Sequence, residues 1–223
     1  MKRKLAALIT CLMIFISQVM TTSYAGVYDG YVRDRASLNA DNVSEKNYKI
    51  FSPDLSEDTE VIETKKDLAD EAAKTYESVA IDEAHFPSEG FRNLVSENFD
   101  TDGDGTLSSD EIREAKIVNS EGDYEIDSLK GIEYLANLKK LNVYSDTLSE
   151  VNITKNPELQ ILSLSGDGAI TSIDTSRNAK LRVFNVTNSS LESVDLTKNP
   201  ELRIFTVPLT SLRSVDLRNN PYL

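Results

Sequence analysis

The chain has 223 residues, of which 37 are acidic and 24 are basic. An acidic chain repels nucleic acid and anionic membrane surfaces and attracts cations, which argues against a nucleic-acid-binding function. The one cysteine, Cys11, lies within the first 25 residues, so the chain without them can form no disulfide and carry no thiol chemistry. Packing, metal binding or both must then hold the fold together.

The first 25 residues have the order of a secretory signal peptide. Three basic residues at positions 2–4 precede the apolar stretch Leu5–Met20, and the small-residue cleavage pattern Ser23–Ala25 follows. A membrane-spanning helix needs about 20 predominantly apolar residues, and this stretch is shorter, although a retained N-terminal anchor is the alternative. We predict a secreted or cell-surface protein with no membrane span in the mature chain. Loss of the three basic residues leaves 21 basic and 37 acidic residues, a formal net charge of −16.

Residues 26–80 are polar and acidic, with no clear hydrophobic period. The stretch Asp54–Glu60 has too few apolar side chains to offset the entropy lost on ordering. Leu68, Ala72 and Tyr76 recur at four-residue steps, so a short helix is the one regular element that this region could form. We predict a disordered acidic linker over 26–80.

Residues 81–114 are predicted to form a helix, a loop and a second helix. The first helix starts at Pro87–Ser88, because a serine hydroxyl can accept a hydrogen bond from a free backbone N–H group at the helix start. Its apolar residues fall on one face, and these are Phe91, Leu94, Val95 and Phe99.

The loop Asp100–Glu111 has oxygen-bearing residues at the spacing that a calcium ion requires. Calcium takes six to eight oxygen ligands, and the predicted metal ligands are Asp100, Asp102, Asp104, Thr106, Ser108 and Glu111. By resemblance to the EF-hand loop, Thr106 would contribute its backbone carbonyl, Ser108 would act through a water, and Glu111 would use both carboxylate oxygens. Gly105 permits the sharp turn with positive φ.

This loop with its preceding helix closely resembles the EF-hand family, and the resemblance implies Ca²⁺ as the bound cofactor. Four carboxylates favour Ca²⁺ over Mg²⁺, which demands a tighter octahedron. The alternative is a solvated acidic turn, since Asp-Gly-Asp-Gly sequences are common in loops. EF-hands usually occur in pairs and this sequence has no second loop. A dockerin module uses such loops in duplicate, so that alternative is weaker.

Residues 115–223 contain a repeat with steps of 21, 22 and 21 residues. The repeat segments begin at Leu138, Leu159, Leu181 and Leu202, and a recurrent asparagine stands at Asn156, Asn178, Asn199 and Asn220. The segment Leu138-x-x-Leu141-x-Val143-x-x-Asp146-x-Leu148 resembles the leucine-rich repeat, with aspartate in place of asparagine. The resemblance implies a solenoid with a parallel sheet, because one unit cannot bury its apolar residues alone.

The predicted strands are Lys140–Tyr144, Ile161–Ser165, Val183–Thr187 and Ile204–Val207. We expect the asparagines to hydrogen-bond backbone groups of neighbouring turns. Ile112-x-x-Ala115-x-Ile117 has the spacing of the repeats, which predicts that the second helix leads directly into a first strand and that the first repeat replaces the missing EF-hand partner.

The predicted fold is α+β, with a single EF-hand capping a short leucine-rich-repeat solenoid. The outward residues of its concave sheet are mostly small and polar, and they are Asn142, Tyr144, Ser163, Ser165, Asn185, Thr187 and Thr206. This face could bind an unknown protein or glycan, or it could be plain solvated sheet.

The predicted function is that of a secreted calcium-binding leucine-rich-repeat protein, acting as a protein- or glycan-binding module at the cell surface. A calcium-stabilised spacer within a larger surface protein is the alternative, and a calcium sensor that opens a groove is a third. The sequence has one histidine, His85, and no nucleotide-binding loop, so we predict that it is not an enzyme. Because the chain stops where another repeat would begin, we expect a fragment of a longer protein, although an open last coil that pairs with something else is the alternative.

Overall fold

The computed structural model describes residues 49–51, 61, 63–64, 66, 68–69, 74–120, 124–166 and 168–223. The predicted signal peptide and most of the predicted linker lie outside these residues. Within the described part of the chain, no helix combines the length and the apolar character needed to cross a membrane.

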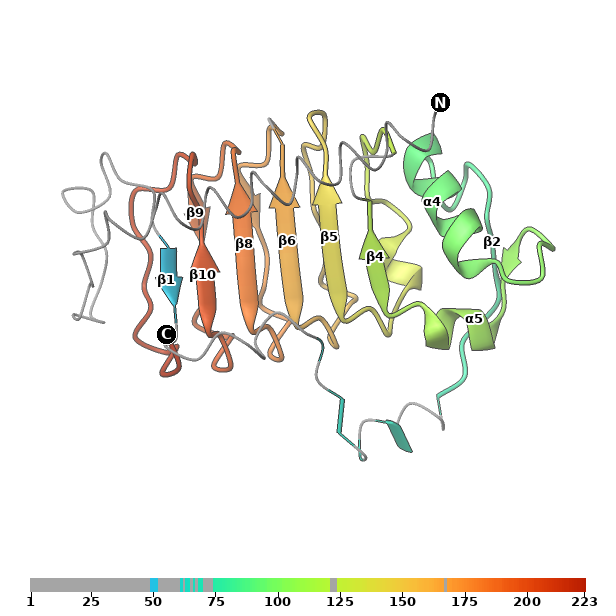
Figure 1. Ribbon diagram of the computed structural model, residues 1–223, viewed down its shortest axis with the longest axis horizontal. Coiled ribbons are helices and arrows are strands. Elements are labelled where there is room, and N and C mark those ends of the chain that lie inside the picture. The colour runs from blue at the N-terminus through green and yellow to red at the C-terminus, as the bar shows by residue number, and fades with distance from the viewer. Residues whose placement is uncertain are drawn as a thin grey trace, which may run out of the picture. The chain divides into compact units, whose positions relative to one another are not determined.

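A six-stranded sheet contains the repeats, with its strands in the order β1-β10-β8-β6-β5-β4. The strands are β1 (Lys49–Phe51), β4 (Ile117–Asn119), β5 (Lys140–Tyr144), β6 (Ile161–Ser165), β8 (Val183–Thr187) and β10 (Ile204–Thr206). All neighbouring pairs are parallel except β1 with β10, which is antiparallel. Figure 1 shows these strands side by side, with β4 nearest the helices.

The strand register confirms a solenoid similar to a leucine-rich-repeat array. Leu141 pairs with Leu162, and Leu162 pairs with Phe184, so equivalent residues of successive repeats lie next to each other. Three of the four predicted strands have the predicted bounds, and the fourth ends at Thr206. On the return side of each coil, β7 (Ser172–Ile173) and β9 (Ser193–Val194) form a second parallel pair.

One continuous hydrophobic core runs through the repeats. The first leucine of each repeat, at positions 138, 159, 181 and 202, is fully buried, and each such side chain contributes about 1.5–3 kcal/mol through its burial. Phe184 and Phe205 stack with ring centroids 5.7 Å apart. The repeat spacing therefore places one apolar side chain of each coil directly beside its counterpart in the next.

The recurrent asparagines link each coil to the one before it, as predicted. The Asn178 Nδ2 donates to the carbonyls of Ile153 (3.0 Å) and Asn156 (2.8 Å). Asn156, Asn199 and Asn220 each make two equivalent bonds. These side chains are buried, so each ladder bond satisfies a backbone carbonyl that water does not reach.

The second helix leads into a first strand, as predicted, but this strand aligns with the repeats three residues later than the spacing Ile112-x-x-Ala115-x-Ile117 implied. Val118 pairs with Leu141 and Ile117 pairs with Lys140, so Ala115 occupies the position of Leu138. Ile117 is consequently 49% exposed on the sheet rather than part of the core. The physical reason is that Ile112 belongs to a helix and is buried there, so the strand can begin only after that helix has ended.

Two helices lie at the β4 end of the sheet (Figure 1). They are α4 (Glu89–Phe99) and α5 (Ser109–Glu114), with β3 (Thr106–Leu107) in the loop between them, and β2 (Val79–Ala80) precedes α4. The Ser88 hydroxyl accepts from the Phe91 amide at the start of α4, and the four predicted apolar residues of α4 are buried. They belong to the same core cluster as the repeat leucines, as does Ile132 of the short helix η1 (Ile132–Tyr134).

Candidate metal centre

The loop after α4 folds around the carboxylate of Asp100. Its Oδ1 accepts from the amides of Gly103 (2.8 Å) and Asp104 (3.1 Å), and its Oδ2 accepts from the Gly105 amide (3.1 Å). Gly105 has a φ of 80°, which L side chains rarely adopt, and a Cβ there would meet nothing within 4 Å. The backbone conformation, and not a shortage of space, therefore requires glycine at this position.

Three aspartates of the loop lie close together. Asp100, Asp102 and Asp104 each offer a carboxylate oxygen, and these oxygens lie within 4.8 Å of one another. The Asp102 carboxylate accepts from the Asp104 amide (3.2 Å), and that of Asp104 accepts from the Thr106 amide (2.8 Å) and hydroxyl (2.7 Å). The loop thus turns three carboxylates towards one point, where a cation would offset their mutual repulsion.

Glu111 closes the loop instead of joining the aspartate cluster. Its Oε1 accepts from the Thr101 amide (2.6 Å) and hydroxyl (2.8 Å), and its Oε2 accepts from the Ser108 amide and hydroxyl, both at 2.9 Å. Ser108 in turn caps α5, because its hydroxyl accepts from the Glu111 amide (3.3 Å). Glu111 is only 8% exposed. Its carboxylate therefore joins the beginning of the loop to its end.

The hydrogen bonds to Glu111 keep its carboxylate ionised. The Ser108 amide has the largest effect, and together with Thr101 it lowers the pKa of Glu111 to about 2, against the opposing effect of burial. The charged form is favoured because four donors point at its two oxygens. A buried glutamate would otherwise tend to be neutral, so this arrangement supplies a fourth negative charge beside the three aspartates.

The six predicted ligands fit a hard divalent cation in donor type and charge. All offer oxygen, and calcium prefers carboxylate, carbonyl and water oxygens. The structure brings together Asp100, Asp102 and Asp104, whereas the carboxylate of Glu111 is engaged by Thr101 and Ser108. The amide and hydroxyl of Thr106 contact Asp104.

The strand before α4 pairs with the loop, and the sequence pattern did not predict this pairing. β2 is antiparallel to β3, so that Val79 lies opposite Leu107, and the Ile81 amide donates to the Gly105 carbonyl (2.9 Å). Residues 79–81, and not the first repeat, therefore supply the neighbouring strand of the loop. The apolar run Val79-Ala80-Ile81 was the available signal, although so short a run does not identify its pairing partner.

A hydrogen-bonded network joins this upstream segment to α5 and to the first repeat. The Tyr76 hydroxyl donates to Asn137 Oδ1 (2.7 Å), and Asn137 Nδ2 donates to the Arg113 carbonyl (3.1 Å). Arg113 donates to the Lys74 carbonyl (2.9 Å), and the Tyr76 amide donates to the hydroxyl of Ser109 (2.9 Å) at the start of α5. The loop and the repeat array are consequently connected by polar contacts as well as by the shared core.

The outer sheet face, defined as the side of the six-stranded sheet away from the main core, carries the predicted outward residues. Six of them are partly buried, and Tyr144 is 49% exposed. Three of them are linked across strands, since Asn142 donates to Asn119 (2.8 Å) and Asn185 donates to Ser163 (3.1 Å). Their predicted orientation is confirmed, and the face offers amide and hydroxyl groups in rows.

Comparison with known proteins gives a limited result. No protein-family model matches the chain. A search of the curated proteins also found no match. Among solved structures, the chain is similar to the functional domain of InlJ from Listeria monocytogenes, described as including a cysteine ladder, with 17% sequence identity and a TM-score of 0.32. That match covers 67% of this chain and 42% of the other, so the chain spans less than half the length of that structure.

Proposed function

We propose that this chain is an exported calcium-binding leucine-rich-repeat protein. The observation that supports calcium binding best is the convergence of three aspartate oxygens within 4.8 Å on a loop with glycines in the positive-φ region. In this proposal Asp100, Asp102, Asp104, the Thr106 carbonyl, Ser108 through a water, and Glu111 hold the ion. Release of Glu111 from Thr101 and Ser108 accompanies its engagement.

The bound ion would act on the repeats through the EF-hand, which serves as the N-terminal cap of the solenoid. Leu107 and Ile112, on either side of the loop end, are buried in the same core as the repeat leucines. An ion that binds only the folded form stabilises it by about 1.4 kcal/mol at ten times the dissociation constant. Extracellular modules bind calcium at about 10⁻⁴–10⁻³ M, so an exported protein would keep such a site filled.

The repeats in this proposal form a protein- or glycan-binding module at the cell surface. The rows of amide and hydroxyl groups on the outer sheet face, with the exposed Tyr144 among them, support a recognition role. Extended solenoid faces are common binding surfaces. Calcium would keep the first repeat in place, so that the face is rigid before a partner arrives.

Calorimetric titration of residues 26–223 with calcium tests this proposal. We expect one bound ion, and we expect Asp104→Asn to weaken binding by about tenfold or more, because a coordinating charge is lost. Asp110→Asn is the matched control, since Asp110 lies in the same loop outside the cluster and pairs with Arg113. The melting temperature should rise with calcium and fall with chelator in the parent chain. Equal weakening by both substitutions, or no binding at all, would contradict the calcium site.

A further inference from the structure

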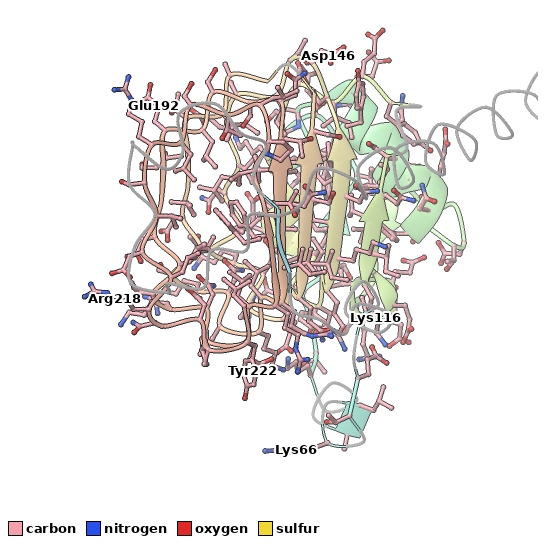
Figure 2. The ribbon with its side chains drawn as sticks, turned by 60° about the vertical axis from the view of Figure 1, so that its left-hand side comes forward. Lys66, Lys116, Asp146, Glu192, Arg218 and Tyr222 are labelled. Atoms are coloured by element: carbon pink, nitrogen blue, oxygen red, sulfur yellow. The ribbon has the colours of Figure 1, made fainter. Side chains whose placement is uncertain are left out.

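A row of basic residues lies at the N-terminal ends of the repeat strands. The residues directly before the five parallel strands are Lys116, Lys139, Gln160, Arg182 and Arg203, here called the basic ladder. From Lys139 onward, the backbone amide of each ladder residue donates to the backbone carbonyl of the ladder residue before it, at 2.8 Å. Figure 2 labels Lys116 at this end of the strands and Asp146 at the opposite end.

The basic ladder is partly withdrawn from water, so its charged groups need anions or hydrogen-bond acceptors beside them. Lys139 is 1% exposed and Arg182 is 4% exposed. Burying a cation without an anion or acceptors costs several kcal/mol. One partner of Lys139 is Glu63, whose Oε1 lies 2.7 Å from the Lys139 ammonium and 3.3 Å from that of Lys116. A carboxylate from the linker region therefore bridges the first two rungs.

An apolar stripe lies beside the basic ladder on the outer sheet face. It consists of Ile161, Val183 and Ile204, the first residues of β6, β8 and β10, which are 4–6% exposed. These three form a cluster separate from the main core, and Val61 packs against it. A row of large apolar side chains on a face that carries mostly polar groups indicates a contact surface.

Val61 contacts the stripe, and Glu63, two positions later in the sequence, contacts the ladder. Side chains two residues apart in an extended segment point to the same side, so an apolar residue can meet the stripe while a carboxylate meets the ladder. At the other edge of the sheet, the backbone of β1 pairs with β10, from Lys49↔Thr206 to Phe51↔Ile204. Described residues of the linker thus meet the sheet in two places.

We propose that the basic ladder and the apolar stripe form a binding site for an extended acidic peptide, which the chain's own linker occupies through Val61 and Glu63. This inference rests on the proposed binding role of the repeats and defines the chemistry of their ligand. The recognised pattern is an apolar residue two positions before a carboxylate. The stripe favours a peptide over a glycan, because a glycan has no aliphatic side chain to bury there.

Charge complementarity supports the linker as the occupant. Residues 52–63 contain five acidic and no basic residues, whereas four of the five ladder residues are basic. Opposite charge steers such a segment to the surface and selects it against others. Tethering also gives an effective concentration on the order of mM. If the dissociation constant of the site is near 0.1 mM, competition from the linker would raise the apparent dissociation constant of a free peptide of the same sequence about tenfold.

The test uses a fluorescent synthetic peptide of residues 52–64 as the probe. It is titrated with the chain 26–223 and with the double variant Val61→Ser, Glu63→Gln, both in saturating calcium. We expect the double variant to bind the probe about tenfold more tightly than the parent chain, because its own linker no longer competes. A peptide of the same composition in scrambled order should bind at least about tenfold more weakly, since the apolar and acidic side chains no longer share a face.

Variants of the site itself complete the experiment. Adding Lys139→Gln to the double variant should weaken probe binding by about tenfold, because a charge-assisted hydrogen bond is lost. Adding Lys198→Gln is the matched control, since Lys198 is exposed, lies in a turn outside the ladder, and loses the same charge. We expect that control to leave probe binding unchanged.

If the parent chain and the double variant bind the probe with equal affinity, the linker does not occupy the site. If the scrambled peptide binds as tightly as the probe, the ladder attracts acidic peptides only through non-specific charge. Loss of probe binding from Lys198→Gln equal to that from Lys139→Gln would have the same consequence. Calcium titration of the double variant separates this inference from the proposed calcium site. If the double variant still binds one calcium ion but does not bind the peptide, the peptide site is refuted and the calcium site is not.

Discussion

The substitution Asn178→Asp tests whether the recurrent asparagines stabilise the repeats through their side-chain donors or only through their shape. Aspartate has nearly the shape of asparagine and keeps the acceptor oxygen, but an ionised carboxylate cannot donate. In the native structure Asn178 Nδ2 donates to the carbonyls of Ile153 and Asn156 at 3.0 and 2.8 Å, and its side chain is fully buried. The variant would instead direct a carboxylate oxygen at two carbonyl oxygens.

The expected loss of stability follows from these contacts. Each lost hydrogen bond costs about 1 kcal/mol, because the Ile153 and Asn156 carbonyls each keep another backbone donor and are not fully orphaned. The buried, unpaired carboxylate adds a desolvation and repulsion cost, so the total is about 3–5 kcal/mol. The carboxyl of the variant should have a raised pKa, and the stability of the variant should partly recover as the pH falls through that value.

Urea denaturation at pH 7 in saturating calcium, followed by circular dichroism, gives the free energy of unfolding. Asn152→Asp is the matched control, because Asn152 is exposed and its Oδ1 only accepts, from the Thr154 amide (3.2 Å) and hydroxyl (2.7 Å). Asp174 occupies the equivalent position in the next repeat, so the control should change stability by less than about 0.5 kcal/mol. A loss from Asn178→Asp below about 1 kcal/mol, or no larger than that of the control, would refute the role of the donors.

Two further substitutions test the loop and the pH dependence. Gly105→Ala should lower the free energy of unfolding by about 1–2 kcal/mol, because φ is 80° at this position. It should also weaken calcium binding in a calorimetric titration. Unchanged affinity would show that the loop adopts another conformation. The pKa of Glu158 is lowered although burial, the largest single effect, raises it, because Lys180 (2.6 Å) and Lys74 (3.5 Å) outweigh burial. The unfolded chain therefore binds this proton at higher pH, so the contribution of Glu158 is complete above its ordinary pKa of 4.5 and is lost as the pH falls through the lower folded value. Glu158→Gln should flatten the curve of unfolding free energy against pH in that acid range. Glu201→Gln, at an exposed position, is the control and should leave the curve unchanged. Equal curves for the two variants would contradict the ion-pair explanation.

The repeats could be predicted in detail because their signal is local and repeated. Each unit carries the same apolar spacing, so one interpretation of the pattern places all four strands, and three have the predicted bounds. The role of the asparagines in linking neighbouring coils could be predicted in the same way, since a polar residue that recurs inside an apolar coil must find backbone partners. The first repeat lacked this support, and its alignment with the other repeats was predicted three residues too early because Ile112 fits the repeat spacing equally well.

The six ligand positions of the loop could also be proposed from spacing, but their contacts could not. The three aspartates converge because the turn at Gly105 curls the backbone over a few residues. Glu111 instead contacts Thr101 and Ser108, which offer it four donors. Which partner a carboxylate takes depends on every donor within reach, and sequence spacing does not rank those donors.

The sequence by itself determined the repeat period, the strands, the face of α4 that is buried and the acidic loop, because each of these depends on residues a few positions apart. Only the tertiary structure decided that β2 pairs with the loop, that Tyr76 joins Asn137, and that Glu63 lies between Lys139 and Lys116. These contacts join residues that are 26 to 76 positions apart. The composition of the chain alone leaves many such pairings possible. The choice among those pairings is made by the packed solenoid, which holds the basic ladder and the apolar stripe side by side in space although they are distributed over five repeats.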